Sequence, residues 1–283
     1  MTERAASSTA VLVCQGRAVA DGRYAVGTFS DPVASHLLDP DERALVEAAR
    51  SGTPPADGRR RMAYELLWRT GILMVPRTVA IDAAVREHGA TQVVVLGAGL
   101  DTFAYRHPFA GLRVFEVDFP ATGAWKRERL AEAGIGVPDS VSHVGVDFES
   151  DDLLGRLAET GFDSSAPAEF MWLGVVPYLT REAAAATLRA IASVPAAEVV
   201  FDYAAADGQE ETAGSRELAA RVAAAGEPFT GRWDPAELAA LLAETGFDDV
   251  EDLGRQEIRV RYLGLDPGEP GGGGHVVRAR RPG

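Results

Sequence analysis

The sequence predicts an α/β fold built on a doubly wound, mostly parallel sheet. Short apolar runs, typical of strands buried on both faces, recur between residues 93 and 203. Stretches with a helical period separate these runs, and such alternation indicates strand–helix–strand units. The chain has 283 residues, of which 46% are hydrophobic and 25% charged, so it can bury a sizeable core.

Residues 1–89 are expected to form a helical cap over the sheet. Apolar residues repeat at three- and four-residue intervals in RALVEAARSG and in RMAYELLWRTGILMVPRTVAIDAAVREHG, and Gly89 is expected to end the last of these helices. Residues 90–283 are expected to form the core, so that the whole chain is one domain. Its first five strands are predicted at Val93–Leu96, Leu112–Val117, Val141–Val146, Phe170–Val176 and Val199–Tyr203, with helices at 121–134, 151–161 and 181–194 between them.

The last fifty residues follow a different pattern. In DPAELAALLAETGF, Asp234 is expected to cap a helix, Pro235 to lie in its first turn and Gly246 to end it. Strands are then predicted at Val250–Leu263 and His275–Arg280, joined by the Gly- and Pro-rich segment LDPGEPGGGG. Two strands with no helix between them are expected to be antiparallel neighbours, forming a C-terminal hairpin.

Composition limits the partners of the chain. The formal net charge is −14, so a phosphate backbone would be repelled and no nucleic-acid partner is expected. No apolar run reaches the length of a membrane span, and the N-terminus lacks the pattern of a signal peptide, so we expect a cytoplasmic protein without a membrane partner. The single cysteine, Cys14, is expected to be buried, and the five scattered histidines predict no metal site.

A glycine-containing loop follows the first predicted strand and reads LGAGLDT. Gly97 and Gly99 would let the backbone turn sharply and approach a ligand closely. Thr102 stands where a dinucleotide-binding loop has its third glycine, and Asp101 stands where a pyrophosphate would lie. The loop therefore favours a ligand without phosphate, such as S-adenosylmethionine (SAM). Asp101 is expected to cap the following helix, to contact the ligand, or to do both.

Carboxylates end the next two predicted strands. Glu116 and Asp118 lie about twenty residues beyond the glycines, where a carboxylate accepts hydrogen bonds from ribose hydroxyls. Alternation places both on the same side of the strand, so one could bind ribose while the other orients it, and we favour Asp118 for the ribose. Asp147 and Phe148 offer a carboxylate for the adenine amino group and an aromatic ring beside it. These acids in order, together with the glycines, predict a cofactor site.

Two other nucleotide-binding classes are excluded by the single lysine. Short-chain NAD(P)-dependent reductases use a Tyr with a Lys four residues later, but position 122 is a threonine before Lys126. A phosphate-binding P-loop needs a Gly-Lys-Ser/Thr sequence, which this chain lacks. Lys126 is expected to be exposed or to pair with an acidic neighbour.

The segments LGAGLDTFAYR, FEVDFPATGAWKRERL, VGVDFESDDLL and WLGVVPYLTREA, in this order, resemble the leucine carboxyl methyltransferase family. The likeness is greatest to its bacterial branch, which includes polyketide-tailoring carboxyl methyltransferases. It implies a Rossmann-like class I methyltransferase with a seven-stranded sheet, a C-terminal antiparallel hairpin and a helical cap. It also implies that Arg77, opening the helix before the first strand, pairs with the SAM carboxylate and that Gly97 lies against the amino-acid moiety. Arg23 is a second candidate for that carboxylate.

The resemblance implies SAM-dependent methylation of a small molecule, on a carboxylate or hydroxyl oxygen, in secondary metabolism. A carboxylate is already ionised at neutral pH and needs no general base. A phenol would need one, for which Tyr178, Tyr203 and His143 are weak candidates, and no catalytic residue is assigned. One departure is Leu173, where many members have an acid; Trp172 beside it is expected to pack in the core. The alternative is a non-catalytic SAM-binding or scaffold relative. The acceptor and the oligomeric state are not readable from the sequence.

Overall fold

A seven-stranded sheet carries the fold. The computed structural model describes residues 8–23, 29–206, 216, 219–220, 223, 229, 231–268 and 274–281. The sheet has the spatial order β3-β2-β1-β4-β5-β7-β6. Strands β1 to β5 are parallel, and β7 runs antiparallel to both of its neighbours, so the predicted class is confirmed. The strands are β1 (Gln92–Leu96), β2 (Arg113–Asp118), β3 (Val141–Gly145), β4 (Ala168–Trp172), β5 (Glu198–Ala204), β6 (Asp249–Leu253) and β7 (Gly274–Arg280).

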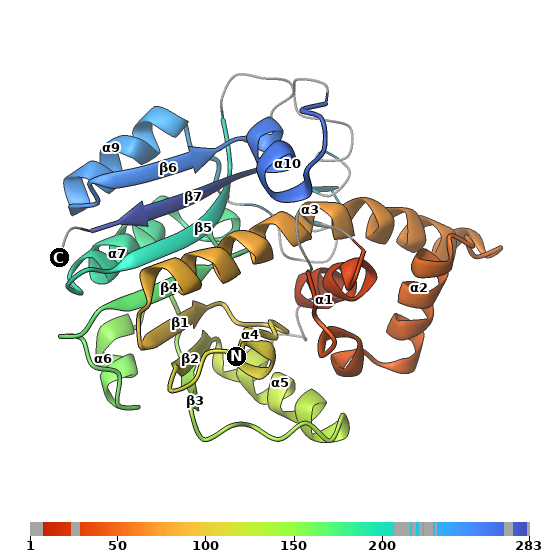
Figure 1. Cartoon of the computed structure of the whole chain (residues 1–283), viewed down its shortest axis with the longest axis horizontal. Helices are drawn as coiled ribbons and strands as arrows, with labels where there is room; N and C mark the ends of the chain where they lie inside the picture. The colour runs from red at the N-terminus through yellow and green to blue at the C-terminus, as the bar shows by residue number, and fades with distance from the viewer. Residues whose placement is uncertain are drawn as a thin grey trace.

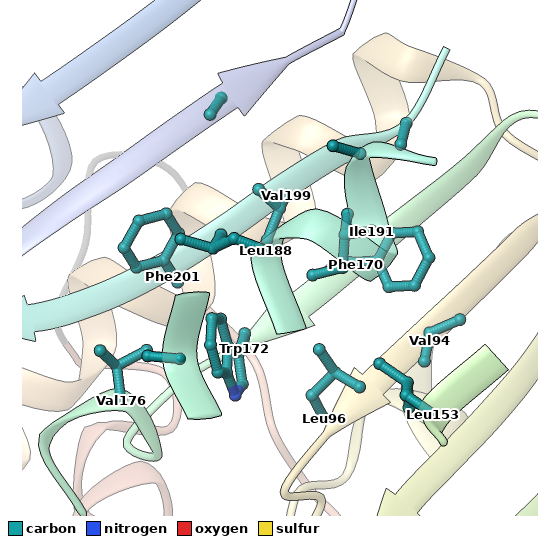
Figure 2. Packing of buried hydrophobic residues seen from close by; sticks show 14 of the residues in the cluster. Val94, Leu96, Leu153, Phe170, Trp172, Val176, Leu188, Ile191, Val199 and Phe201 are labelled. Carbon is teal, nitrogen blue, oxygen red and sulfur yellow. The ribbon is translucent and has the colours of Figure 1, made fainter. Parts of the chain in front are cut away.

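Helices cover both faces of this sheet (Figure 1). On one face, α6 (Leu153–Ala158), α7 (Arg181–Ala192) and α9 (Pro235–Thr245) pack against apolar side chains of the strands. Figure 2 shows part of this layer, with Trp172 of β4 and Phe201 of β5 near Leu188 of α7. On the other face lie α3 (Gly58–His88), α4 (Phe103–Arg106) and α10 (Arg255–Leu263). Because both faces are covered, β1 and β4 are entirely buried, which explains their unbroken apolar sequences.

The N-terminal helices form a group of their own at one end of the sheet (Figure 1). Helices α1 (Ser8–Ala20) and α2 (Pro40–Ser51), with the short 3-10 helix η1 (Ala34–Leu37), pack around the first half of α3. Cys14 lies in this cluster, buried as predicted, and its thiol donates to the carbonyl of Ala34 at 3.2 Å. Gly89 ends α3 in the left-handed conformation, also as predicted.

Helix α3 is continuous over 31 residues, so the prediction that a helix opens at Arg77 is wrong. Pro76 lies inside α3 and removes one backbone donor, which usually kinks or ends a helix. Here the residues on either side are anchored, since Val75 and Ile81 are completely or almost completely buried. Burial of this apolar face offsets the missing bond, and Arg77 therefore lies mid-helix, where α3 crosses the sheet.

Two predicted strand boundaries also need correction. The segment predicted as one strand, Val250–Leu263, is strand β6 followed by helix α10, because Gly254 interrupts the strand and its N–H donates to the Glu257 carboxylate at 2.7 Å, as at a helix start. β6 and β7 are nevertheless antiparallel neighbours, as predicted. β4 ends at Trp172 rather than Val176, since Gly174 adopts a left-handed conformation. Part of the LDPGEPGGGG segment lies outside the described residues.

The predicted caps of α9 are confirmed. The Asp234 side chain accepts from the first-turn amides, and Gly246 closes the helix with a φ of 96°. Among the described helices, none combines the length and apolarity that crossing a membrane requires.

Candidate functional site

A cavity of about 380 Å³ lies at the carboxyl ends of β1, β2 and β4, where open α/β sheets bind ligands. Its floor is the loop after β1 together with the ends of the neighbouring strands. Its roof comes from the N-terminal helices, with Ala10 and Arg17 contributed by α1 and Arg77 and Thr78 by α3. The cavity is thus enclosed between the sheet and the helical cap, and its volume is that of a small-molecule site.

The loop after β1 requires its first glycine. Gly97 has a φ of 67°, and a Cβ added there would lie 2.2 Å from the Cγ2 atom of Val175. The amides of Gly97 and Ala98 both donate to the carbonyl of Val117, at 2.8 and 3.0 Å, which fixes the turn against β2. Gly99, with a φ of 45°, also lines the cavity. The close approach of backbone to ligand space predicted from the glycines is present.

Asp118 ends β2 at the wall of the cavity, and the backbone holds its carboxylate in place. One oxygen accepts from the Gly99 amide at 2.6 Å and the other from the Phe119 amide at 2.7 Å. Burial raises the pKa of the Asp118 carboxyl, and the two amide hydrogen bonds oppose that rise. Each oxygen keeps a further lone pair with which a carboxylate can accept a ligand hydroxyl.

Glu116, the other carboxylate predicted on β2, is buried and lies outside the 380 Å³ cavity. Its carboxylate pairs with Lys126 at 2.7 Å, accepts from the Tyr105 hydroxyl at 3.3 Å, and faces His143 at 3.3 Å. Of the two alternatives expected for Lys126, exposure or pairing with an acidic neighbour, the structure shows the second: Lys126 is 1% exposed and lies on α5 (Pro120–Glu132).

Asp101 lies in the cavity wall at the start of α4. One of its oxygens accepts from the Phe103 amide at 2.7 Å, and the other lies 3.9 Å from the guanidinium of Arg17. Burial opposes ionisation of this carboxyl, but the charges of Arg17 and Lys126 outweigh it, so the pKa of Asp101 is lowered. Asp101 therefore bonds to the first turn of the short helix, one of the two roles expected for it, and also borders the cavity.

Arg77 reaches the cavity from α3 and pairs there with Asp202 of β5. The second oxygen of Asp202 accepts from the Gly174 amide at 2.5 Å. Gly174 has a φ of 69°, in the left-handed region that favours glycine, and a Cβ there would only touch the Arg77 guanidinium, at 3.8 Å. Asp202 was not predicted as a site residue, although FDY at the end of β5 repeats the strand-end carboxylate seen in FEVDFP.

Asp147 and Phe148 follow β3 and lie in the same cavity. The Asp147 carboxylate accepts from the Glu149 amide at 3.0 Å, and its own amide donates to Asp151 at 2.9 Å, which forms a tight turn. Phe148 is half-buried against the main core cluster. A carboxylate and an aromatic ring are thus placed side by side on the opposite side of the cavity from Arg77.

Arg17 is a buried cation that sequence analysis missed. Its guanidinium donates to Asp31 at 2.9 Å and to the carbonyl of Leu100 at 2.5 Å, which ties α1 to the glycine loop. Thr102 donates to the same Asp31 oxygen at 2.6 Å. Arg23, the second candidate for the SAM carboxylate, is exposed and is not among the described residues lining the cavity.

The structure therefore brings most of the predicted site residues into one cavity. They are Arg77, Gly97, Gly99, Asp101, Asp118, Asp147 and Phe148. Glu116 borders a second, smaller cavity that adjoins the first.

Comparison with known proteins gives the class of this site. Residues 10–192 match the leucine carboxyl methyltransferase family. YktD of Bacillus subtilis (strain 168), provisionally named an S-adenosyl-L-methionine-dependent methyltransferase, is 36% identical over 245 residues, which cover 81% of this chain and 75% of YktD. This chain belongs to the leucine carboxyl methyltransferase family. It is a SAM-dependent methyltransferase, and SAM is its cofactor.

Solved structures agree on the fold. A provisionally named methyltransferase of Thermobifida fusca YX superposes with a TM-score of 0.57 at 17% identity, covering 96% of this chain and 94% of that one. Human N-acetylserotonin methyltransferase, solved in complex with SAM, gives a TM-score of 0.50 at 12% identity and covers 98% of this chain and 68% of its own. At these identities the likeness establishes only the Rossmann-like class I fold of this methyltransferase.

The departure at Leu173 is visible in the cavity wall of this methyltransferase. Leu173 lines the cavity with an apolar side chain, next to Gly174 and below Arg77. Trp172 is completely buried in the main core cluster, as predicted (Figure 2). The nearest described carboxylate to Arg77 comes instead from β5, as Asp202.

One group of potential metal ligands exists among the described residues, at the opposite ends of the strands. His88, Glu169 and Glu198 have ligand atoms within 4.8 Å of one another. His88 is hydrogen-bonded to Glu169 at 3.1 Å and to the carbonyl of Ala196 at 3.0 Å, and Arg278 and Arg280 pair with Glu198. The carboxylates of Glu169 and Glu198 thus already face cationic protein groups, and the three residues belong to a buried ion-pair network.

Proposed function

We propose that this methyltransferase transfers the methyl group of SAM to an oxygen of a small molecule, a carboxylate in preference to a hydroxyl. The observation that carries the proposal is the set of titratable groups around the 380 Å³ cavity. Its described lining includes no histidine, cysteine or lysine, and its carboxylates already accept hydrogen bonds from other protein groups: Asp101, Asp118 and Asp147 from backbone amides, and Glu149 from the Thr180 hydroxyl. A hydroxyl acceptor needs a base to remove its proton, whereas a carboxylate is ionised at neutral pH and attacks unaided.

Two of the three other candidates for a general base are not among the described residues that line the cavity. His143 faces Glu116 and the Tyr105 hydroxyl and is not among the cavity-lining residues. Tyr203 is 1% exposed, and its hydroxyl donates to Asp252 at 2.7 Å. Tyr178 lines the cavity and packs against Phe229 with ring centroids 5.2 Å apart. For an acceptor that is already ionised, positioning supplies the rate enhancement, which can amount to about 7–11 kcal/mol.

We further propose that SAM occupies this cavity. Asp118 would accept the ribose hydroxyls with the lone pairs that its two amide bonds leave over. Arg77 would pair with the methionine carboxylate, with the loop at Gly97 and Gly99 against the amino-acid moiety. Asp147 and Phe148 would border the adenine. Asp101 and the buried Arg17 would form the wall beside the loop, where Asp101 favours a ligand without phosphate.

The chemistry divides between cofactor and protein. Bound SAM supplies a methyl group on a positively charged sulfur. The chain would hold the acceptor oxygen in line with that methyl group, and the cap helices α1 and α3, which line the cavity, would shield it from water. The apolar Leu173 in the wall leaves the acceptor side without a carboxylate at that point, which would otherwise repel an anionic acceptor.

The experiment that tests the proposal uses SAM labelled in the methyl group and a panel of aromatic and aliphatic carboxylic acids, with matched phenols and alcohols. We expect label transfer to at least one acid, in a product from which mild alkali releases methanol, as from a methyl ester. An alkali-stable product formed only with phenols or alcohols would contradict the carboxylate assignment. Tight SAM binding without transfer to any oxygen acceptor would instead favour the non-catalytic alternative.

A further inference from the structure

The only lysine among the 28 Lys and Arg residues of the chain is also the most deeply buried cation among the residues that the structure describes. Lys126 is 1% exposed and lies on the inner face of α5 (Pro120–Glu132). Taking an ammonium and a carboxylate out of water costs several kcal/mol per ion, and apolar replacements are often as stable. The pair that Lys126 forms with Glu116 is therefore not explained by stability alone.

Aromatic and polar groups fix this pair. The ammonium nitrogen donates to one Glu116 oxygen at 2.7 Å and lies 5.5 Å from the centre of the Tyr105 ring, over its face. The other Glu116 oxygen accepts from the Tyr105 hydroxyl and faces His143, both at 3.3 Å. Glu116 is thus held from three sides, and it keeps the lysine ammonium at one place beneath β2.

The ion pair of Lys126 and Glu116 borders the same small cavity as Asp118. Glu116 and Asp118 are two residues apart on β2 and so lie on the same face of the sheet. Both line a second cavity of about 250 Å³ together with Lys126. This cavity meets the 380 Å³ cavity at Ala98, Gly99 and Asp118, which line both. Asp118 is therefore the wall between the proposed cofactor site and the chamber that holds the ion pair.

A ligand over Asp118 would remove its remaining water. Burial already raises the pKa of this carboxyl, and the charge of Glu116 adds to that rise, whereas the charge of Lys126 lowers the pKa. Protonation would turn one acceptor oxygen into a donor and lose a bond to ribose. The charged and titratable groups that border the chamber or the loop beside Asp118 are Glu116 on β2, Lys126 and Arg127 on α5, His143 on β3, Arg156 on α6, Tyr105 on α4, Asp101 after β1 and Arg17 on α1.

We propose that Lys126 is a positioning residue of the cofactor site: held by Glu116, its ammonium keeps the Asp118 carboxylate ionised and in place while SAM covers it. This inference rests on the proposed contact between Asp118 and the ribose. It explains why a buried ion pair lies directly behind the strand-end acid, and why the basic residue at this position of α5 points inward.

Titration of SAM into the wild-type protein and Lys126→Met at several pH values from 5 to 8 tests the proposal. We expect the two affinities to be similar at pH 8, where Asp118 is ionised in both. As pH falls, the affinity of Lys126→Met should decline at a higher pH than that of the wild type. A midpoint shift of about one unit corresponds to about tenfold weaker binding at a pH below both midpoints. Lys126→Arg should retain most of the wild-type profile, because it restores the charge.

A Lys126→Met profile parallel to that of the wild type, with the same loss at every pH, would show a structural role only and overturn the proposal. Should Lys126→Met not fold, the double variant Glu116→Gln with Lys126→Met leaves no buried charge unpaired. We expect it to shift the midpoint in the same direction by a smaller amount, and an unshifted midpoint overturns the proposal there too. Asp118→Asn tests the contact between Asp118 and the ribose separately from the role of Lys126. Unchanged SAM affinity in that variant would show that Asp118 does not bind the ribose, whatever the Lys126 variants show.

Discussion

At the scale of single residues, the site depends on charges paired across long sequence distances. Arg77 and Asp202 are 125 residues apart, yet α3 and β5 bring them together at the cavity edge, where both are only slightly exposed. Asp202 also accepts from the Gly174 amide at 2.5 Å, so it fixes both the guanidinium and the backbone after β4. Arg77 can then bind a carboxylate without first being ordered by it.

This arrangement predicts strong coupling between the two side chains. Asp202→Ala should weaken SAM binding although Asp202 is not among the cavity-lining residues, because Arg77 loses the partner that orients it. A double-mutant cycle with Arg77→Ala, measured by calorimetric titration of SAM, should give a coupling energy of about 0.5–3 kcal/mol. Strictly additive effects would show that Asp202 does not position Arg77 for the cofactor.

Sequence patterns identified local site residues and missed the long-range ones. Gly97, Asp118 and Asp147 were predicted because each follows a strand within a few residues, and parallel strands end at one edge of the sheet. Arg17 and Asp202 were missed because their roles depend on partners more than eighty residues away. For Asp202 the strand-end carboxylate in FDY was a local signal, whereas no local pattern distinguishes Arg17 from an ordinary surface charge.

At the scale of elements, the cap helix α1 is docked on the cofactor loop by charge rather than by apolar contact alone. Arg17 of α1 pairs with Asp31 while its guanidinium also donates to Leu100 in the loop. Thr102 donates to the same Asp31 carboxylate. Any movement of α1 would therefore disturb the glycine loop, and the cap and the site form one unit.

Replacement of Asp31 by Ala should destabilise the protein markedly. Both members of the Arg17–Asp31 pair are buried, and removing one partner of such a pair costs about 3–5 kcal/mol. We expect a loss of about 3 kcal/mol in the free energy of unfolding by urea, since Asp101 still faces Arg17.

The matched control is Asp41→Ala, which removes an exposed partner of Arg60. The side chains of that pair are 89% and 59% exposed, so the change should stay within about 0.5 kcal/mol. Equal losses in the two variants would contradict the role of Asp31 in docking the cap.

The opposite ends of the strands carry a pH-sensitive contact between α3, β4 and β5. Burial raises the pKa of Glu169 to about 8, and its hydrogen bond to His88 raises the pKa of that imidazole. The folded pair thus retains a proton up to about pH 8 that the unfolded chain has released by about pH 6.5. The folded state binds the extra proton, so stability must fall as pH rises through this window.

We expect the pair to contribute a decrease of about 1–2 kcal/mol in the free energy of unfolding between pH 6.5 and 8, which Glu169→Gln should largely remove. Urea unfolding at four or five pH values in this range measures the slope for both proteins. The same slope in wild type and variant would show that the pair does not hold the extra proton.

The positions of most elements were predictable because both faces of the sheet are covered. Complete coverage makes β1 and β4 uninterrupted apolar runs, which are easily recognised. Prediction failed where tertiary contacts decide the local structure. Pro76 does not end α3, since the flanking turns are buried, and the alternation after Gly254 belongs to a helix that packs on one face of the sheet.

At the scale of the whole molecule, function follows from where the chain places its charges. The net charge is −14, and acidic side chains end β2 and β5 and follow β1 and β3 at the same edge of the sheet. Such an edge disfavours pyrophosphate and suits a nucleoside carried by a cationic, phosphate-free cofactor. The family membership and the cavity geometry thus support the same cofactor for independent reasons.

Calorimetric titration of the purified protein with SAM and, separately, with NADH tests this account most directly. The account predicts micromolar binding of SAM, no binding of NADH, and a loss of about 1–3 kcal/mol in SAM binding for Asp118→Ala. The control is Asp163→Ala, which removes an exposed carboxylate before β4 and should leave SAM binding as in the wild type. Folded protein that bound NADH, or bound SAM equally well without the Asp118 carboxylate, would contradict the assignment of the cavity.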